Sequence, residues 1–194
     1  MFDIGGVVVH TDFQKLYTNF ATRIGISPSL VANYHKDYFD DLILGTKSLE
    51  DLWDNMETAG GAPRDNFKSI WLEEGAAVRT GDSNLIKLIC KLRKSYSIGA
   101  VTNLTEDRLI IDEKTKLYAN FDYKVLSCIE HIKKPDAKFY QLALSKASLS
   151  SKEAVFIDDK EVNVLGAESI GIHGIVYFGY NSLIASLQKL NIDL

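Results

Sequence analysis

Short apolar runs and helical repeats alternate along the second half of the chain. The runs that resemble strands cover residues 96–102, 123–128, 154–158 and 174–178. Between them, apolar residues recur at helical spacing, as at Leu85, Leu88 and Leu92. A strand that is buried on both faces of a parallel sheet reads as a continuous apolar run, and alternation with helices is typical of βαβ units. The pattern therefore predicts an α/β fold with a Rossmann-like parallel sheet core.

Residues 12–80 follow a different pattern, with helical periodicity and no convincing strand. One helical face collects the apolar residues Phe13, Leu16, Tyr17, Phe20 and Ile24. We therefore expect a core domain formed by residues 1–11 and 81–194, with an all-helical cap insertion at 12–80.

Local signals within the insertion indicate where its helices begin. Ser27 before Pro28 reads as an N-cap with proline at the first helical position, and Ser48 with Asp51 resembles a capping box. The segment 60–63 (Gly-Gly-Ala-Pro) reads as a turn between helices.

Charge and cysteine content narrow the class of partner. The net charge is −4 and no basic stripe is present, so we expect neither a nucleic-acid nor a membrane partner. Cys90 and Cys128 lie in apolar stretches without metal-type spacing, which favours two buried thiols in a reducing compartment. The cytoplasm is the expected location. The oligomeric state stays open.

Polar residues stand where the predicted strands end. Asp3 ends the first strand, Thr102-Asn103 the second and Asp158-Asp159 the fourth, while Lys134 lies just after the third. In open α/β sheets, ligands bind beyond the carboxyl ends of the strands. We therefore expect these side chains to converge on one crevice.

Phosphoryl transfer through a carboxylate fits these residue types. A carboxylate can attack phosphorus and form an aspartyl-phosphate, but two anions repel, so the site needs positive charge. Mg²⁺ prefers oxygen ligands, and the three aspartates are its candidate ligands. Lys134 is expected to pair with Asp3 and the phosphate. The Thr102 hydroxyl and the N–H groups of Thr102 and Asn103 are expected to bind the remaining phosphate oxygens.

At these positions the chain resembles the haloacid dehalogenase-like (HAD) hydrolase superfamily, in particular subfamily I, which carries a helical cap. The stretches that carry the resemblance are Asp3-Ile4-Gly5-Gly6-Val7-Val8-Val9, Val101-Thr102-Asn103, Lys134-Pro135-Asp136 and Phe156-Ile157-Asp158-Asp159-Lys160. The first stretch and the Asp12-Phe13 pair look most similar to the glucose-1-phosphate phosphatase type. The resemblance implies a Mg²⁺-dependent phosphatase that acts on a small phosphorylated metabolite, with sugar phosphates as candidate substrates.

The resemblance also implies roles at matching positions. Asp3 would be the nucleophile and a metal ligand, and the carbonyl of Gly5 a second ligand. Asp159 would bind the metal directly. Asp158 would be a closer ligand or would bind the metal through a water molecule. The expected catalytic residues are Asp3, Lys134 and Thr102, and the expected substrate-binding residues are Thr102, Asn103, Lys134 and Gly6.

One departure from the family pattern bears on the reaction. The first motif usually carries a second aspartate two residues after the nucleophile, which serves as general acid and base, and here that position is Gly5. Two other readings therefore stay open. One is a 2-haloacid dehalogenase, which also lacks the second aspartate but needs no metal. The other is a catalytically weak binding or regulatory module.

Overall fold

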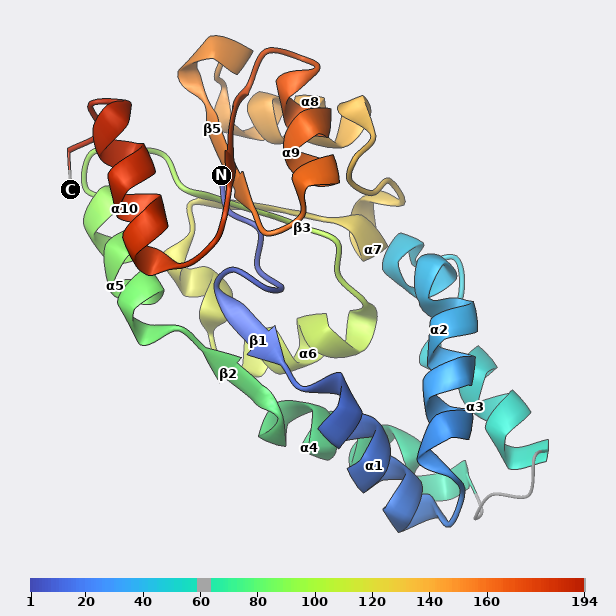
Figure 1. The fold of residues 1–194 in the computed structure, drawn as a ribbon. Coiled ribbons are helices and arrows are strands. Elements are labelled where there is room, and N and C mark those ends of the chain that lie inside the picture. The colour runs from blue at the N-terminus through green and yellow to red at the C-terminus, as the bar shows by residue number, and fades with distance from the viewer. Residues whose placement is uncertain (59–63, 194) are drawn as a thin grey trace.

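The computed structural model describes residues 1–58 and 64–193 and contains a parallel sheet between two helix layers (Figure 1). Residues 1–3 lie at the centre of the sheet. Their backbone bonds to β3 (Gly99–Thr102) on one side, from Phe2 N to Gly99 O at 2.8 Å, and to β5 (Val155–Asp158) on the other, from Asp3 N to Ile157 O at 2.8 Å. The outer strands, β4 (Tyr123–Leu126) and β6 (His173–Val176), pair in parallel with β3 and β5. The predicted α/β fold is confirmed.

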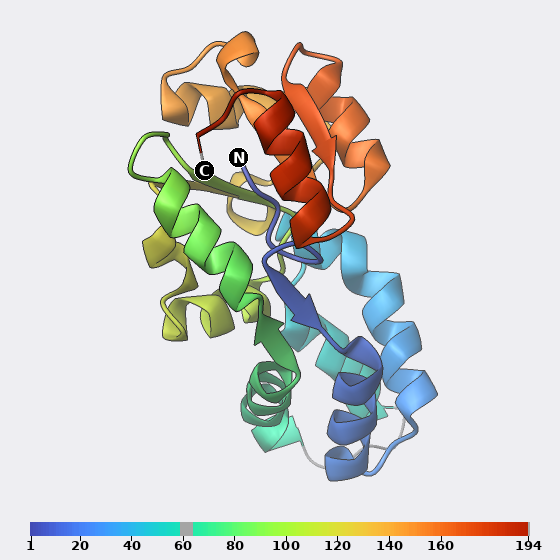
Figure 2. The same cartoon turned by 60° about the vertical axis from the view of Figure 1, so that its left-hand side comes forward.

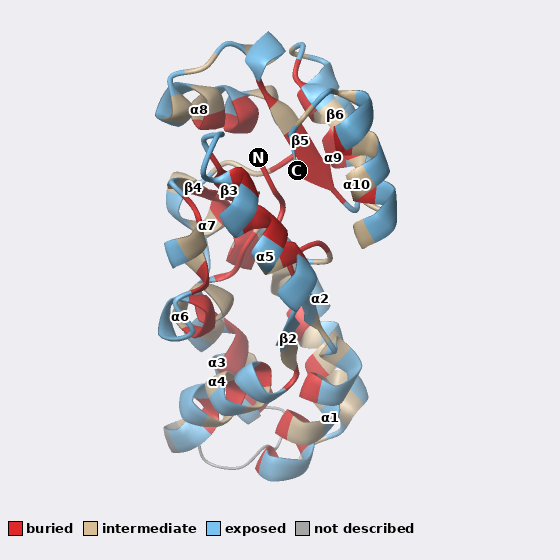
Figure 3. Cartoon of the chain, turned by 90° about the vertical axis from the view of Figure 1, so that its left-hand side faces the viewer, coloured by how far each residue is buried: buried red, intermediate tan, exposed pale blue. Residues whose placement is uncertain are grey.

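The helices cover the two faces of this sheet because successive strand residues point in opposite directions. Ala100 and Ile157 pack with α5 (Ser83–Leu92) and α10 (Tyr180–Lys189), whereas Val101 and Phe156 pack with α8 (Ala137–Ala147) and α9 (Glu161–Glu168). Figure 3 shows the buried residues gathered in the strands and on the inner sides of these helices. The remaining elements of this half are α6 (Glu106–Lys114), α7 (Ser127–Glu130) and the short 3₁₀ helices η2 (Leu117–Asn120) and η3 (Ser151–Glu153).

A second apolar cluster lies among the helices of residues 13–77. These are α1 (Phe13–Ile24), α2 (Pro28–Leu44), α3 (Leu49–Thr58), η1 (Arg64–Asn66) and α4 (Phe67–Ala77). The largest side chains of the cluster, Trp53 and Trp71, are fully buried. The expected caps are present: Ser27 accepts from Leu30 N, and Ser48 N donates to Asp51 Oδ2 at 2.7 Å. The turn expected at 60–63 lies outside the described residues.

Two short antiparallel strands join this helical region to the rest of the fold. β1 (Val9–Thr11) pairs with β2 (Arg79–Gly81), so that the chain enters and leaves the helical region side by side (Figure 2). β2 begins at Arg79, just inside the expected end of the insertion at residue 80. We retain the division into a core and a cap insertion as a proposal.

Several details differ from the sequence expectations. The run 174–178 is a strand only as far as Val176, and Cys128 is half-buried rather than buried. The apolar run 123–128 ends as a strand at Leu126, and Ser127 and Cys128 begin α7. Cys90 is exposed rather than buried, because it lies on the outer side of α5 while Leu88, Ile89 and Leu92 face the core. Within the described residues, none of the helices has the length and apolar character that crossing a bilayer requires.

Candidate active site

Three carboxylates meet at the carboxyl edge of the sheet. Asp3 ends the central extended segment, and Asp158 and Asp159 follow from β5 beside it. One oxygen of each lies within 4.8 Å of the others. The spatial strand order runs β4, β3, residues 1–3, β5, β6, so the site lies where the order of strands along the chain reverses. This switch point is the usual ligand site in such sheets.

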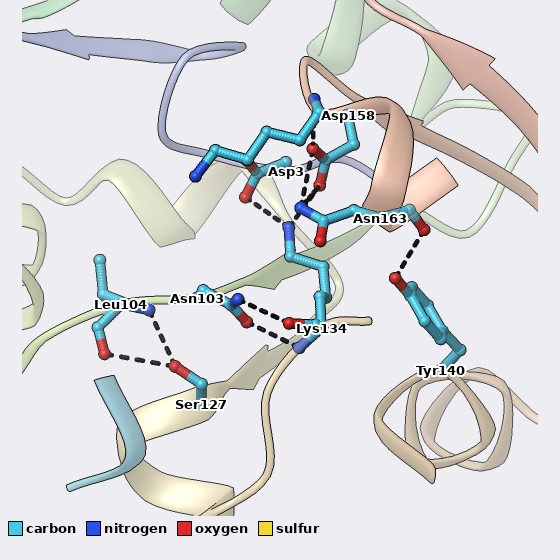
Figure 4. Close-up of polar contacts among 9 residues, drawn as sticks. Asp3, Asn103, Leu104, Ser127, Lys134, Tyr140, Asp158 and Asn163 are labelled. Carbon is cyan, nitrogen blue, oxygen red and sulfur yellow. Dashed lines mark hydrogen bonds and ion pairs between the residues drawn. The ribbon is translucent and has the colours of Figure 1, made fainter. Parts of the chain in front are cut away.

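Lys134 joins two of these carboxylates. Its Nζ lies 2.8 Å from Asp3 Oδ1 and 2.6 Å from Asp158 Oδ2, and the side chains of all three residues are buried (Figure 4). A charge that leaves water needs partners, and two ion pairs supply them here. Asn103 fixes the backbone of Lys134, because Lys134 N donates to Asn103 Oδ1 at 2.9 Å and Asn103 Nδ2 donates to Lys134 O at 3.1 Å. Both the backbone and the ammonium of Lys134 are therefore fixed by hydrogen bonds or ion pairs.

Asp158 and Asp159 differ in how many donors they engage. Asp158 accepts from Lys134, from the Lys160 N–H at 2.8 Å and from Asn163 Nδ2 at 3.0 and 3.1 Å. Asp159 is exposed, and no side chain in the described parts of the chain donates to its carboxylate. Asp158 therefore orients Lys134, and Asp159 keeps its oxygens available for a ligand.

Gly6 allows Asp159 to approach the first loop. Its φ is +85°, and a Cβ at this position would lie 2.4 Å from Asp159 Oδ2. Its own N–H donates to Val9 O at 2.9 Å, so this amide is engaged within the loop. Gly5 differs from Gly6 in its φ, which is not positive, and in its surroundings, because an added Cβ would meet no atom within 4 Å. Of the two glycines, only Gly6 is required by the local geometry.

Burial and mutual repulsion act on the carboxylates. Burial raises the pKa of Asp3, and the charge of Asp158 adds to this, while Lys134 and a hydrogen bond from the Thr102 side chain act in the opposite direction. Although Asp159 as a whole is exposed, partial desolvation of its carboxyl, with a further contribution from Asp158, raises the pKa of this group. One ammonium thus faces three acids, and a cation bound among them would relieve the repulsion. The three carboxylates offer only oxygen atoms as metal ligands, the ligand type that suits Mg²⁺.

Three supporting residues were not identified as such from the sequence. The sequence predicts no role for Asn163, yet its amide donates to both oxygens of Asp158. Tyr140 Oη donates to Asn163 O at 2.6 Å. Ser127 Oγ accepts from Leu104 N at 2.9 Å and so fixes the loop after β3. Ser127 did carry a signal, because it is a polar residue at the end of an apolar run.

The structure brings together Asp3, Thr102, Lys134, Asp158 and Asp159, as expected from the strand ends. The Asn103 side chain serves the Lys134 backbone instead of facing a ligand, which leaves its N–H for the expected phosphate contact. His131 Nδ1 lies 2.8 Å from Leu44 O, between α7 and α2. The exposed His10 belongs to β1. The ligand roles of the Gly5 carbonyl and of Gly6 stay predictions.

Known proteins are similar to this chain in sequence or in architecture. Flavin mononucleotide hydrolase 1 of Arabidopsis thaliana is 33% identical over 99 residues, which are 51% of this chain and only 40% of that protein. Sesquiterpene phosphatase astK of Aspergillus oryzae is 25% identical over 181 residues, 90% of this chain and 87% of that protein.

A HAD family enzyme of Bacteroides thetaiotaomicron, crystallised with magnesium and inorganic phosphate, has the same fold. The TM-score is 0.74 at 21% identity, over 90% of this chain and 91% of that one. The family model described as haloacid dehalogenase-like hydrolase matches residues 1–171. This match covers most of the chain and both ends of the site, from Asp3 to Asp159. The chain belongs to the haloacid dehalogenase-like hydrolases.

Proposed function

We propose that the protein is a Mg²⁺-dependent phosphatase that removes phosphate from a small phosphorylated metabolite, with Asp3 as the nucleophile. The observation that carries the proposal is the arrangement of Lys134 between Asp3 and Asp158, with the unengaged carboxylate of Asp159 beside them. Such a site offers a nucleophile, a fixed positive charge and free oxygen ligands within one small space.

The chain's own residues account for two chemical steps. Asp3 attacks phosphorus, the phosphorus–oxygen bond to the leaving group breaks, and an aspartyl-phosphate forms. Water then attacks this phosphorus, which releases phosphate and restores the carboxylate. Lys134 holds the Asp3 oxygen in place and partly neutralises the phosphate, and the N–H of Asn103, directly after β3, is the candidate donor to its remaining oxygens.

The carboxylate set fits a magnesium ion. Asp3 and Asp159 are the residues that would hold it, with the Gly5 carbonyl as a further oxygen ligand and Asp158 behind Asp3. When bound, the ion supplies Lewis-acid stabilisation of charge on the phosphate oxygens.

The names of two relatives support a small phosphorylated metabolite as the substrate. One relative is named as a flavin mononucleotide hydrolase and another as a sesquiterpene phosphatase, and a sugar phosphate is the candidate that the first motif favours. A 2-haloacid dehalogenase remains the competing enzyme, because Gly5 offers no second carboxylate. The exposed oxygens of Asp159 favour the metal-dependent reaction over the dehalogenase.

One panel of assays tests the proposal. Phosphate release from p-nitrophenyl phosphate and from sugar phosphates is measured with Mg²⁺ and with EDTA, beside chloride release from a 2-haloacid. We expect phosphate release only with Mg²⁺ and none from Asp3→Asn. Chloride release without metal would identify a dehalogenase, and the absence of both activities in the folded wild-type protein would favour the binding module.

Two neighbouring glycines provide a matched control. Gly6→Ala forces Asp159 away, because its Cβ would overlap that carboxylate, and should abolish Mg²⁺-dependent turnover. Gly5→Ala meets open space and should leave turnover within about threefold of the wild type. Equal activity in the two variants would contradict the metal role of Asp159.

A further inference from the structure

We propose that Arg108 binds a second oxyanion, a carboxylate or a further phosphate, on the leaving group of the substrate. The proposal rests on the phosphatase function above and assigns it a substrate class, phosphomonoesters that carry a second negative group. Arg108 belongs to α6, the helix that follows Thr102 and the loop of the candidate site. Figure 1 shows α6 between the sheet and the helices of the cap insertion.

Arg108 is half-buried, and one nitrogen of its guanidinium is buried without a hydrogen-bond partner. Its Nη2 atom is shielded from solvent, and among residues 1–58 and 64–193 it finds no hydrogen-bond acceptor. The guanidinium stays charged at any pH where the protein is folded. A buried donor without a partner is costly, and such groups call for a specific explanation.

Aromatic rings determine the direction from which an anion can reach this group. The guanidinium carbon lies 4.4 Å from the centroid of the Phe13 ring and 5.5 Å from that of Phe39. Rings of this kind interact with the face of a guanidinium and accept no strong hydrogen bond. The donors therefore stay available in the guanidinium plane, where two oxygens of a carboxylate or phosphate bind side by side.

The neighbouring carboxylates form their hydrogen bonds elsewhere. Burial lowers the pKa of Arg108 and the charge of the preceding Asp107 raises it, but no hydrogen bond among the described residues joins the two side chains. Asp107 Oδ2 accepts from Trp71 Nε1 at 2.7 Å, and Asp107 Oδ1 is buried without a hydrogen-bond partner. Asp112 forms a two-point ion pair with Arg79, at 2.7 and 2.8 Å.

The position of Arg108 suits the leaving group rather than the reacting phosphate. Lys134 already supplies the cation beside Asp3, and Arg108 lies in the first turn of α6, which follows Thr102 after a short loop and faces the side of the cap insertion. Phe13 and Phe39 come from α1 and α2 and are only partly buried, so solvent reaches this side of α6. A substrate whose phosphate lies at Asp3 would extend its other end toward these helices.

A matched series of aryl phosphates tests the proposal. Phenyl phosphate, 4-carboxyphenyl phosphate and 1,4-phenylene bisphosphate share one ring and differ only in the second group, so the last two separate a carboxylate from a phosphate as ligand. We expect wild-type kcat/KM to be at least about tenfold higher for one of the charged substrates than for phenyl phosphate, the range of a charge-assisted hydrogen bond. Arg108→Met keeps the stem against Phe13 and should remove this preference while leaving phenyl phosphate turnover nearly unchanged.

Further measurements separate this role from a structural one. Asp107→Asn, a change at the adjacent buried residue, should keep the preference. Arg108→Met should unfold at the same temperature as the wild type or higher, because it removes a buried nitrogen that has no hydrogen-bond partner. A wild type without preference, or an Arg108→Met variant that retains it, would overturn the proposal.

Binding of unreactive analogues keeps this test independent of turnover. Calorimetry with phenylphosphonate and 4-carboxyphenylphosphonate should give the same ratio of affinities and the same loss in Arg108→Met. If the wild type binds both analogues with this ratio but cleaves no phosphate ester, the phosphatase proposal fails and the oxyanion site stands. If it cleaves phenyl phosphate but shows no ratio, the oxyanion site fails alone.

Discussion

Placing an aspartate at position 5 should speed the reaction for poor leaving groups above all. The resemblance to the family implies a general acid at this position, and Gly5 cannot supply one. The structure indicates that the substitution is tolerated, because a Cβ on Gly5 would meet no atom within 4 Å and its φ is not positive. Gly5 also belongs to the same loop as Asp3, so a carboxyl group at this position would lie close to the bond that breaks.

The size of the effect depends on the leaving group. A positioned general acid contributes about 10²–10⁴-fold, or roughly 3–5 kcal/mol of the activation barrier. An alkoxide needs that proton and p-nitrophenolate does not. We therefore expect Gly5→Asp to raise kcat/KM for ethyl phosphate by about 100-fold and for p-nitrophenyl phosphate by less than tenfold.

The assay compares three proteins on both substrates at saturating Mg²⁺. Gly5→Asn has the shape of the aspartate but no acid to donate, so it should resemble the wild type. A single-turnover measurement shows whether breakdown of the aspartyl-phosphate limits the rate. An equal gain on both substrates, or the same gain from the asparagine variant, would refute the reasoning and indicate that another group already supplies the proton.

Three further predictions concern the contacts that hold the fold together. Gly45→Ala and Gly25→Ala both place alanine at positive φ, at a cost of about 1–2 kcal/mol. Only a Cβ on Gly45 would overlap a backbone carbonyl of α7, at 2.3 Å, so urea unfolding should show a larger loss of unfolding free energy for Gly45→Ala. Arg79→Met leaves the buried Asp112 carboxylate without its ion pair and should cost about 3–5 kcal/mol, most of which the double change with Asp112→Leu should restore. Burial lowers the pKa of His35 to about 4, below its unfolded value of about 6.5, so the unfolded state binds the extra proton between these pH values. Stability should therefore be complete above pH 6.5 and about 2 kcal/mol lower at pH 5, and a His35→Gln variant should lack this part of the dependence; identical profiles would contradict the assignment.

Much of the architecture could be predicted because buried positions make apolar residues recur in the sequence with a spacing that is typical of each kind of element. Continuous apolar runs predicted the strands at 99–102 and 155–158, and their polar ends predicted which side chains would meet. The run at 123–128 was misjudged at its end, since a short apolar stretch does not distinguish a strand from the start of a helix. Cys90 was misjudged because an apolar neighbourhood in the sequence does not specify which side of a helix a residue occupies.

The supporting contacts of the site depend on distances between segments that are remote along the chain. The pairing of Lys134 with Asp3 was expected from charge alone, but its second ion pair with Asp158 was not. Lys134 pairs with Asp3 from more than 130 residues away, and Gly6 makes room for a side chain more than 150 residues later. No local pattern encodes such contacts, because they arise only when the sheet brings the strand ends together.

The pairing of β1 with β2 has a consequence for how the substrate range of such a chain can change. The two ends of residues 12–78 are held at neighbouring positions, Thr11 opposite Arg79, so the distance between them does not depend on what lies between. For a flexible connection, doubling its length costs only about 0.6 kcal/mol in closure entropy. Changes in the length of the segment can therefore be absorbed at this pair, whereas an exchange of the whole segment must also keep its contacts with α6 and α7, such as those of Trp71 with Asp107 and of Leu44 with His131. The β1–β2 pair is thus a fixed attachment point for the helical segment. Grafting the helices of a relative between Thr11 and Arg79 should transfer that relative's substrate preference while Asp3 and Lys134 stay unchanged.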